Sequence, residues 1–146
     1  MPTSVPDCPF CEIVERGDPD VREVCRNDDF VVFFPLEPAT IGHTLIVPRE
    51  HLPTIWDLPD RLARELGSMT VEVSRAVRRA MKPGGLNVIQ SNGAAATQTV
   101  MHLHVHVVPR WEGDSVGRIW PPETSYPDSI KDEAWELIRA ECRTIT

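Results

Sequence analysis

The sequence predicts an α+β domain in which a five-stranded antiparallel sheet is covered on one face by one long helix. Two observations carry this prediction. Short runs rich in β-branched and aromatic residues alternate with turn-forming residues, and one long amphipathic segment separates the third run from the fourth. The other connections suit hairpins, so that segment is the one crossover helix. A length of 146 residues suits one domain with one core, which we place at about residues 8–114, followed by a C-terminal extension over 115–146.

Each element has its own local signal. Arg26-Asn27-Asp28-Asp29 is a turn-like tetrapeptide between the first two strand-like runs, which predicts a hairpin. Pro9 can occupy the first turn of a short helix, and Ser129 is a candidate N-cap for a last one. The predicted strands are residues 21–25, 30–34, 43–47, 86–90 and 100–109, and the predicted helices are 9–16, 60–81 and 129–143.

The long helix has the clearest pattern. Its apolar residues recur at steps of three and four, which places them on one face. Pro59 lies at its start, and Pro83-Gly84-Gly85 ends it. The residues of the predicted buried face are Leu62, Leu66, Met69, Val73, Val77 and Ala80.

Charge and composition exclude several classes of function. A net charge of -7 argues against a protein that grips long nucleic acid through many phosphate contacts, although a local donor cluster can still hold a small anion. No apolar run approaches the length of a membrane span, and the N-terminal residues lack the pattern of a secretory signal. We therefore expect a cytoplasmic protein without a disulfide framework. Cys25 and Cys142 have apolar neighbours and are predicted to be buried thiols.

The strongest functional signal is a row of histidines. His102, His104 and His106 are spaced by two, so on a strand their side chains would share one face while Leu103, Val105 and Val107 enter the core. Three structural histidines would need three separate polar partners, and a site that only binds metal is a second alternative. We favour catalysis, because a neutral imidazole is a good nucleophile toward phosphorus and neighbouring imidazoles can orient it or move a proton.

At this point the sequence resembles the histidine triad family. The pattern His-φ-His-φ-His-φ-φ, with φ apolar, spans His102 to Val108 and follows Gln98-Thr99-Val100-Met101. The resemblance includes Cys-Pro-Phe-Cys near the N-terminus and the run from Gly42 to His51. It implies the fold of that family, a homodimer in which the long helix and an edge strand pair across a two-fold axis, and a small-molecule nucleotide as ligand.

The resemblance also implies roles for individual residues. His104 would attack the α-phosphorus of a nucleotide, His106 would contact the phosphate or its bridging oxygen, and His43 would orient the nucleophile. Phe10 and Ile13, which local sequence alone would assign to the core, match the base pocket. The remaining expected substrate contacts are Leu36 near the ribose, Gln98 and Thr99 at the phosphate, and Asn92, with Ser91 as its rival, at the scissile bond.

Cys8 and Cys11 have the Cys-x-x-Cys spacing of a zinc knuckle and would need two further ligands. In a subset of the family that this sequence resembles, those ligands correspond to His51 and His102. We therefore expect a structural Zn²⁺ at Cys8, Cys11, His51 and His102. The alternative is a pair of reduced, buried cysteines without metal.

Two positions depart from the family pattern. Pro35 stands where most relatives carry a ribose-binding Asp or Asn, and Glu37 is a possible substitute. Thr97 stands where glycine usually precedes the conserved glutamine. The altered positions suggest an altered substrate, because every histidine is present. We expect a nucleotide hydrolase or nucleotidyltransferase that acts through a covalent nucleotidyl-histidine on dinucleoside polyphosphates, phosphoramidates or nucleotide sugars. The alternative is a nucleotide-binding or scaffolding protein with vestigial catalysis.

Overall fold

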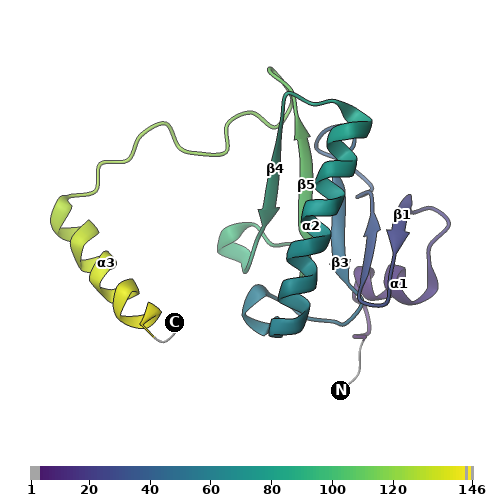
Figure 1. Ribbon diagram of the computed structural model, residues 1–146, viewed down its shortest axis with the longest axis horizontal. Helices are drawn as coiled ribbons and strands as arrows, with labels where there is room; N and C mark the ends of the chain where they lie inside the picture. The colour runs from purple at the N-terminus through teal and green to yellow at the C-terminus, as the bar shows by residue number, and fades with distance from the viewer. Residues whose placement is uncertain (1–3, 144, 146) are drawn as a thin grey trace.

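The computed structural model describes residues 4–143 and 145, and its centre is the five-stranded antiparallel sheet that the sequence predicts (Figure 1). The strands lie in the order β1-β2-β3-β5-β4, and each neighbouring pair is antiparallel. The strands are β1 (Glu23–Arg26), β2 (Phe30–Phe33), β3 (Thr44–Pro48), β4 (Gly85–Gln90) and β5 (Val105–Arg110). The α-helices are α1 (Pro9–Arg16), α2 (Asp60–Met81) and α3 (Asp128–Cys142), and two short 3-10 helices span Ile55–Asp57 and Ala94–Ala96.

Both faces of the sheet carry a buried apolar layer. Every residue of β2 and β3 is buried, because alternate side chains of these strands enter opposite layers. One layer includes Val32 and Ile46 and packs against α2; the other includes Val31 and Val47 and packs against Val14 of α1. The predicted long helix therefore covers one face, and the short N-terminal helix covers part of the other.

Helix α2 has the predicted bounds, and its apolar face points to the sheet. Leu62, Leu66, Val73 and Val77 are buried and Met69 is partly buried, whereas Ala80 is exposed. Lys82 ends the helix in a left-handed conformation with φ of 50°. Pro83 and Gly84 then carry the chain into β4.

The fifth strand is shorter than the predicted 100–109. It begins only at Val105, because its pairing with β3 ends at Ile46 and its pairing with β4 ends at Gln90. Before Val105 the backbone is irregular, and the Leu103 N–H donates to the carbonyl of Leu52 in a loop. His102 and His104 therefore precede the strand, although Leu103, Val105 and Val107 enter the core as predicted.

The C-terminal segment leaves the sheet domain beyond the β4 edge and ends in α3, which stands apart from the sheet (Figure 1). No residue of α3 is buried. Pro127, not Ser129, occupies its N-cap position. The prediction that Cys25 and Cys142 are buried was wrong: Cys25 lies on the short edge strand β1 and Cys142 on α3, and both are exposed. Within the described part of the chain, no helix combines the length and apolar character that a membrane span requires.

Candidate functional site

His43, His104 and His106 meet at one cavity of about 280 Å³. His106 lies on β5, His43 directly precedes β3, and His104 directly precedes β5. The cavity therefore opens where the ends of two neighbouring central strands meet the loops that lead into them. The other residues that line it are Ala39, Asn87, Ile89, Ser91, Thr97, Gln98, Thr99, Val108 and Val116.

His104 is held in the tautomer that a nucleophile requires. Its Nδ1 lies 2.7 Å from the carbonyl oxygen of His102, so Nδ1 must carry the hydrogen and donate it. Nε2 of the neutral ring then keeps its lone pair. Burial lowers the pKa of His104 although the bond to the His102 carbonyl opposes the shift. The ring is thus neutral at pH 7 and available for attack.

His43 and His106 form a hydrogen-bonded pair whose tautomers follow from the backbone. The Ala39 N–H donates to Nδ1 of His43 at 3.0 Å, so a neutral His43 carries its hydrogen on Nε2. Nε2 lies 2.9 Å from Nδ1 of His106 and donates to it. His106 therefore carries its hydrogen on Nε2. Burial, and then positive charge on His104 and His43, lowers the pKa of His106 to about 4.

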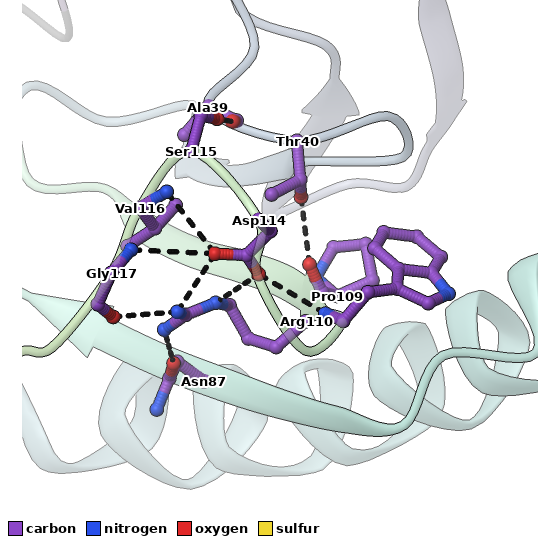
Figure 2. A network of polar contacts seen from close by, with 10 residues as sticks. Ala39, Thr40, Asn87, Pro109, Arg110, Asp114, Ser115, Val116 and Gly117 are labelled. Carbon is purple, nitrogen blue, oxygen red and sulfur yellow. Dashed lines mark hydrogen bonds and ion pairs between the residues drawn. The ribbon is translucent and has the colours of Figure 1, made fainter.

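Gly42 allows His43 to reach this position. Its φ is +96°, and a Cβ there would lie 2.8 Å from Cγ of Met81 and 3.3 Å from Cγ of Pro109. The loop before β3 thus packs closely against the end of α2. The hydroxyl of Thr40 ties the same loop to β5 by donating to the carbonyl of Pro109 at 2.7 Å (Figure 2).

Gln98 shapes the other wall of the cavity through its buried side chain. Its Oε1 accepts from the Gly93 N–H at 2.7 Å, and its Nε2 donates to the carbonyls of Pro53 and Val100. Its amide is therefore occupied with loop structure. Thr97, where the family usually has glycine, adopts a left-handed conformation with φ of 67°, which explains why glycine suits this position.

The loop after β5 lines the cavity with Val116 and is held in place by Asp114 (Figure 2). The Asp114 side chain is 8% exposed and accepts from Nε and Nη2 of Arg110 and from the backbone N–H groups of Trp111, Val116 and Gly117. The Arg110 guanidinium keeps the pKa of Asp114 well below its usual range. Ser115 donates from Oγ to the carbonyl of Ala39 at 2.8 Å, which links this loop to the one that orients His43.

Only some of the residues predicted to bind substrate line the cavity. Thr99 and Gln98 line the cavity, and so does Ser91, the rival of Asn92. Oδ1 of Asn92 accepts from the Ile55 N–H at 2.7 Å, and its amide also bonds to Gln90. It is not among the residues of the cavity wall.

Phe10 and Ile13, which were predicted to bind the base, do not line the cavity. The Phe10 ring meets the His104 ring edge-on with centroids 5.0 Å apart, and Ile13 is also partly buried against the same core layer. Leu36 is 78% exposed and does not line the cavity. Pro35 and Glu37 are not part of its wall either.

Cys8, Cys11, His51 and His102 form a second cluster beside His104. Their ligand atoms all lie within 4.8 Å of one another, and the two cysteines and His102 are buried. Nε2 of His102 donates to the carbonyl of Pro48 at 2.8 Å, so its Nδ1 lone pair faces Sγ of Cys8 and Sγ of Cys11, each 3.5 Å away. Nδ1 of His51 lies 3.3 Å from Sγ of Cys11.

This donor set fits a tetrahedral zinc ion. Zn–S and Zn–N bonds of about 2.3 and 2.0 Å place neighbouring ligand atoms roughly 3.3–3.8 Å apart, close to the Sγ–Nδ1 distances here. Burial raises the pKa of the Cys11 thiol, so a thiolate at this position needs a nearby cation. The predicted single row of histidines is therefore divided: His102 turns to the cysteines, and His104 and His106 line the cavity.

Several residues at the site were missed by sequence reasoning. Ala39 acts through its backbone, which no side-chain pattern shows. Asn87 lines the cavity from β4 and accepts from Nη1 of Arg110 at 2.7 Å. The run Trp111-Glu112-Gly113-Asp114 after the histidine strand is predicted from the sequence to border the leaving-group side, and in the structure Asp114 holds this loop.

Sequence comparison gives relatives along most of the chain. Residues 17–113 match the HIT domain family. "Protein hit" of Bacillus subtilis is 33% identical over 128 residues, covering 87% of this chain and 86% of that protein. "Adenylylsulfatase HINT3" of Arabidopsis thaliana is 32% identical, covering 90% of this chain and 66% of that protein. "Adenosine 5'-monophosphoramidase hnt1" of Schizosaccharomyces pombe is 30% identical, covering 85% and 90%.

Solved structures share the fold. SMU.412c from Streptococcus mutans superposes with a TM-score of 0.87 and 34% identity, covering 97% of this chain and 88% of that chain. A Zn-bound histidine triad family protein from Mycobacterium smegmatis has a TM-score of 0.70 and 30% identity, covering 95% of both chains.

Proposed function

Because this chain belongs to the histidine triad (HIT) family, we propose that it is a nucleotide hydrolase or nucleotidyltransferase in which His104 attacks the α-phosphorus of a nucleoside phosphate derivative. The observation that carries the proposal is the 2.7 Å bond from Nδ1 of His104 to the carbonyl of His102. It leaves Nε2 of a neutral ring as the nucleophile at the cavity that His43 and His106 also line.

The first step transfers the nucleotidyl group to the enzyme. The Nε2 lone pair of His104 forms a bond to phosphorus while the bond from phosphorus to the leaving group breaks. The leaving group departs with that electron pair, and the Nε2–H of His106 donates a hydrogen bond to the departing atom; a solvent proton then completes a basic leaving group. The His102 carbonyl stabilises the positive charge that develops on the His104 ring.

The second step releases the nucleotide. Water attacks phosphorus, the P–N bond breaks, the electron pair returns to Nε2 of His104, and the water loses one proton. In a transferase, phosphate or a sugar phosphate replaces water. The relay from Ala39 through His43 keeps the His106 hydrogen on Nε2 in both steps.

The proposed contacts to the base, the ribose and the phosphate follow from where each residue lies relative to His104. Phe10, which contacts the His104 ring, and Ile13 would offer an apolar wall for the base, and Ser91 and Thr99, which line the cavity with His104, would meet the phosphate. Leu36 would reach the ribose only from an exposed loop. Asn92 would act at the scissile bond only after its bond to the Ile55 N–H is broken, so Ser91 is the better-placed contact.

Zinc at Cys8, Cys11, His51 and His102 would hold the N-terminal segment against the chain that leads to His104. When bound it would supply a structural cross-link, because four protein ligands leave no open coordination position. The proposal extends to a homodimer paired through α2 and an edge strand, and to a cytoplasmic protein that binds small nucleotides without long nucleic acid or membrane as partners. The names of the Arabidopsis and fission-yeast relatives support hydrolysis at an adenylyl phosphate.

The test compares the wild type with His104→Asn on a fluorogenic adenosine 5′-phosphoramidate and on diadenosine polyphosphates. Asparagine keeps a polar group beside Phe10 but cannot form the intermediate. We expect turnover to fall at least about 10³-fold, and acid quenching of the wild type to trap an adenylyl group on His104 by mass spectrometry. Full activity of the variant on any substrate would overturn the mechanism. Equal, near-zero turnover by both proteins, with nucleotide binding retained, would favour a binding module instead.

A further inference from the structure

A second cavity, of about 340 Å³, adjoins the catalytic one at Asn87, which lines both. Its remaining wall comes from Arg110 on β5 and from the segment that follows the Asp114 loop. That segment contributes Arg118, Ile119, Trp120 and the following pair of prolines. A molecule that extends from the His104 cavity past Asn87 therefore enters this second space.

Arg110 bonds to Asn87, the residue that lines both cavities (Figure 2). Its Nη1 donates to Oδ1 of Asn87 at 2.7 Å, and its Nη2 donates to the carbonyl of Gly117 at 2.6 Å. The Asn87 oxygen is thereby occupied, so its amide nitrogen is the group that can donate to an anion. The bond to Gly117 also anchors the chain immediately before Arg118.

The two arginines of this cavity differ in charge balance. Arg110 is compensated by Asp114. Arg118 has no carboxylate partner among residues 4–143, so it brings a net positive charge to the second cavity. An ammonium-like or neutral leaving group would gain nothing from this charge, whereas phosphate oxygens would.

Trp120 offers an exposed aromatic surface in the same cavity. Its side chain is 82% exposed beside Arg118, and Pro121 and Pro122 restrict the backbone that presents it. An exposed indole on a stiff segment, next to a free guanidinium, is a surface on which a nucleic acid base can stack while its phosphates are paired.

We propose that this second cavity is the leaving-group subsite and that it takes the distal nucleotide of a dinucleoside polyphosphate. The Asn87 amide and Arg118 contact the phosphates beyond the scissile bond, and Trp120 stacks on the second base. This inference rests on the proposed function, because it requires attack by His104 at the first nucleotide.

The experiment compares two substrates that share an adenylyl group but differ in leaving group. Diadenosine tetraphosphate leaves a nucleotide, and adenosine 5′-phosphoramidate leaves ammonia. We expect Trp120→Ala and Arg118→Gln each to lower kcat/KM for the dinucleotide by about 10-fold, mainly through KM, since stacking of one base contributes roughly 5- to 100-fold. Turnover of the phosphoramidate should change less than about twofold. Trp120→Phe should restore most of the dinucleotide activity.

Helix α3 provides matched controls. Trp135 is also exposed, and Cζ of Arg139 lies 5.3 Å from its ring centroid, so an exposed tryptophan and an arginine also lie together away from the cavity, with Arg139 paired to Glu136. Trp135→Ala and Arg139→Gln should leave both substrates unaffected.

Each outcome decides a different claim. Unchanged dinucleotide kinetics in both subsite variants, an equal loss on both substrates, or a wild type that cleaves only the phosphoramidate would overturn the subsite and leave the proposed function intact. A wild type that cleaves neither substrate, or a fully active His104→Asn protein, would overturn the proposed function itself.

Discussion

Nε2 of His43 donates to Nδ1 of His106 across 2.9 Å, and the Ala39 N–H fixes the direction of that bond from the other side of the His43 ring. One backbone amide thus determines which nitrogen of His106 faces the cavity with a hydrogen. Two imidazoles without this anchor could exchange tautomers, and His106 could then present a lone pair to a phosphate instead of a donor.

The pair gives a first prediction, that His43→Ala lowers kcat by about 10²-fold with little change in KM, because the donor to the departing atom is no longer fixed. His43→Gln retains an amide donor toward Nδ1 of His106 and should recover part of the loss. The measurement is steady-state kinetics on the phosphoramidate. A His43→Ala protein with wild-type kcat would contradict the relay.

The second prediction concerns pH. Burial, followed by positive charge on His104, lowers the pKa of His43, and the pKa of His106 is about 4. The unfolded chain binds protons at these groups from about pH 6.5 downward while the folded chain does not, so the free energy of unfolding should fall from about pH 6.5 to pH 4. Above pH 7 these two groups should contribute no slope.

His106→Asn isolates this effect, because other groups titrate in the same range. Urea unfolding at pH 7.5, 6 and 5 should show a smaller loss of stability toward acid in the variant than in the wild type. Identical slopes for the two proteins would show that His106 is protonated normally in the folded state.

The third prediction concerns the cluster around Cys11. Cys11→Ser should reduce zinc from about one ion per chain to less than a tenth. We expect a cost of about 3 kcal/mol or more, which for a chain of this length lowers Tm by roughly 6–12 °C. Below that Tm, kcat should stay within a few-fold of the wild type. Cys25→Ser, an exposed thiol on β1, is the matched control and should change neither zinc content nor Tm.

The fourth prediction concerns Thr97, a β-branched residue with φ of 67°. A left-handed conformation costs an L-residue about 1–2 kcal/mol, while glycine adds flexibility to the unfolded chain. Thr97→Gly should therefore raise the free energy of unfolding by about 0.5–1 kcal/mol. Thr99→Gly, two residues on and without a positive φ, should lower it. Calorimetry of both variants tests the pair, and a destabilised Thr97→Gly protein would contradict the strain.

The elements with a strong periodic signal could be predicted from the sequence. Helix α2 has its predicted bounds because its apolar period and its flanking Pro59 and Pro83 agree. Five antiparallel strands were also confirmed. The predicted strand around the histidines is longer than the observed one. An alternating sequence predicts a strand along its whole length, but β5 begins only where it pairs with β3 and β4.

The histidines and cysteines of the site could be proposed from motifs, but their geometry could not. The grouping of His102 with Cys8 and Cys11 agrees with the cluster expected from the family resemblance, whereas strict alternation on a strand would place His102 and His104 on one face. The contribution of Ala39 is a backbone hydrogen bond, and the bonds from Arg110 to Asn87 and from Ser115 to Ala39 join segments distant in sequence, so neither leaves a local pattern. Cys25 was predicted to be buried because its neighbours in the sequence are apolar. It is exposed because β1 lies at the edge of the sheet.

His102 has two separate attachments, its ring nitrogen toward the cysteines and its carbonyl toward His104. Any residue can supply a carbonyl, but only a few side chains can bind a metal. Evolution can therefore exchange the metal-binding residues of this fold for a packed apolar cluster without redesigning the nucleophile, provided the peptide at position 102 keeps its place. The geometry that orients the His104 ring is therefore separate from the geometry of the four-residue cluster, because the first uses the backbone of residue 102 and the second uses its side chain.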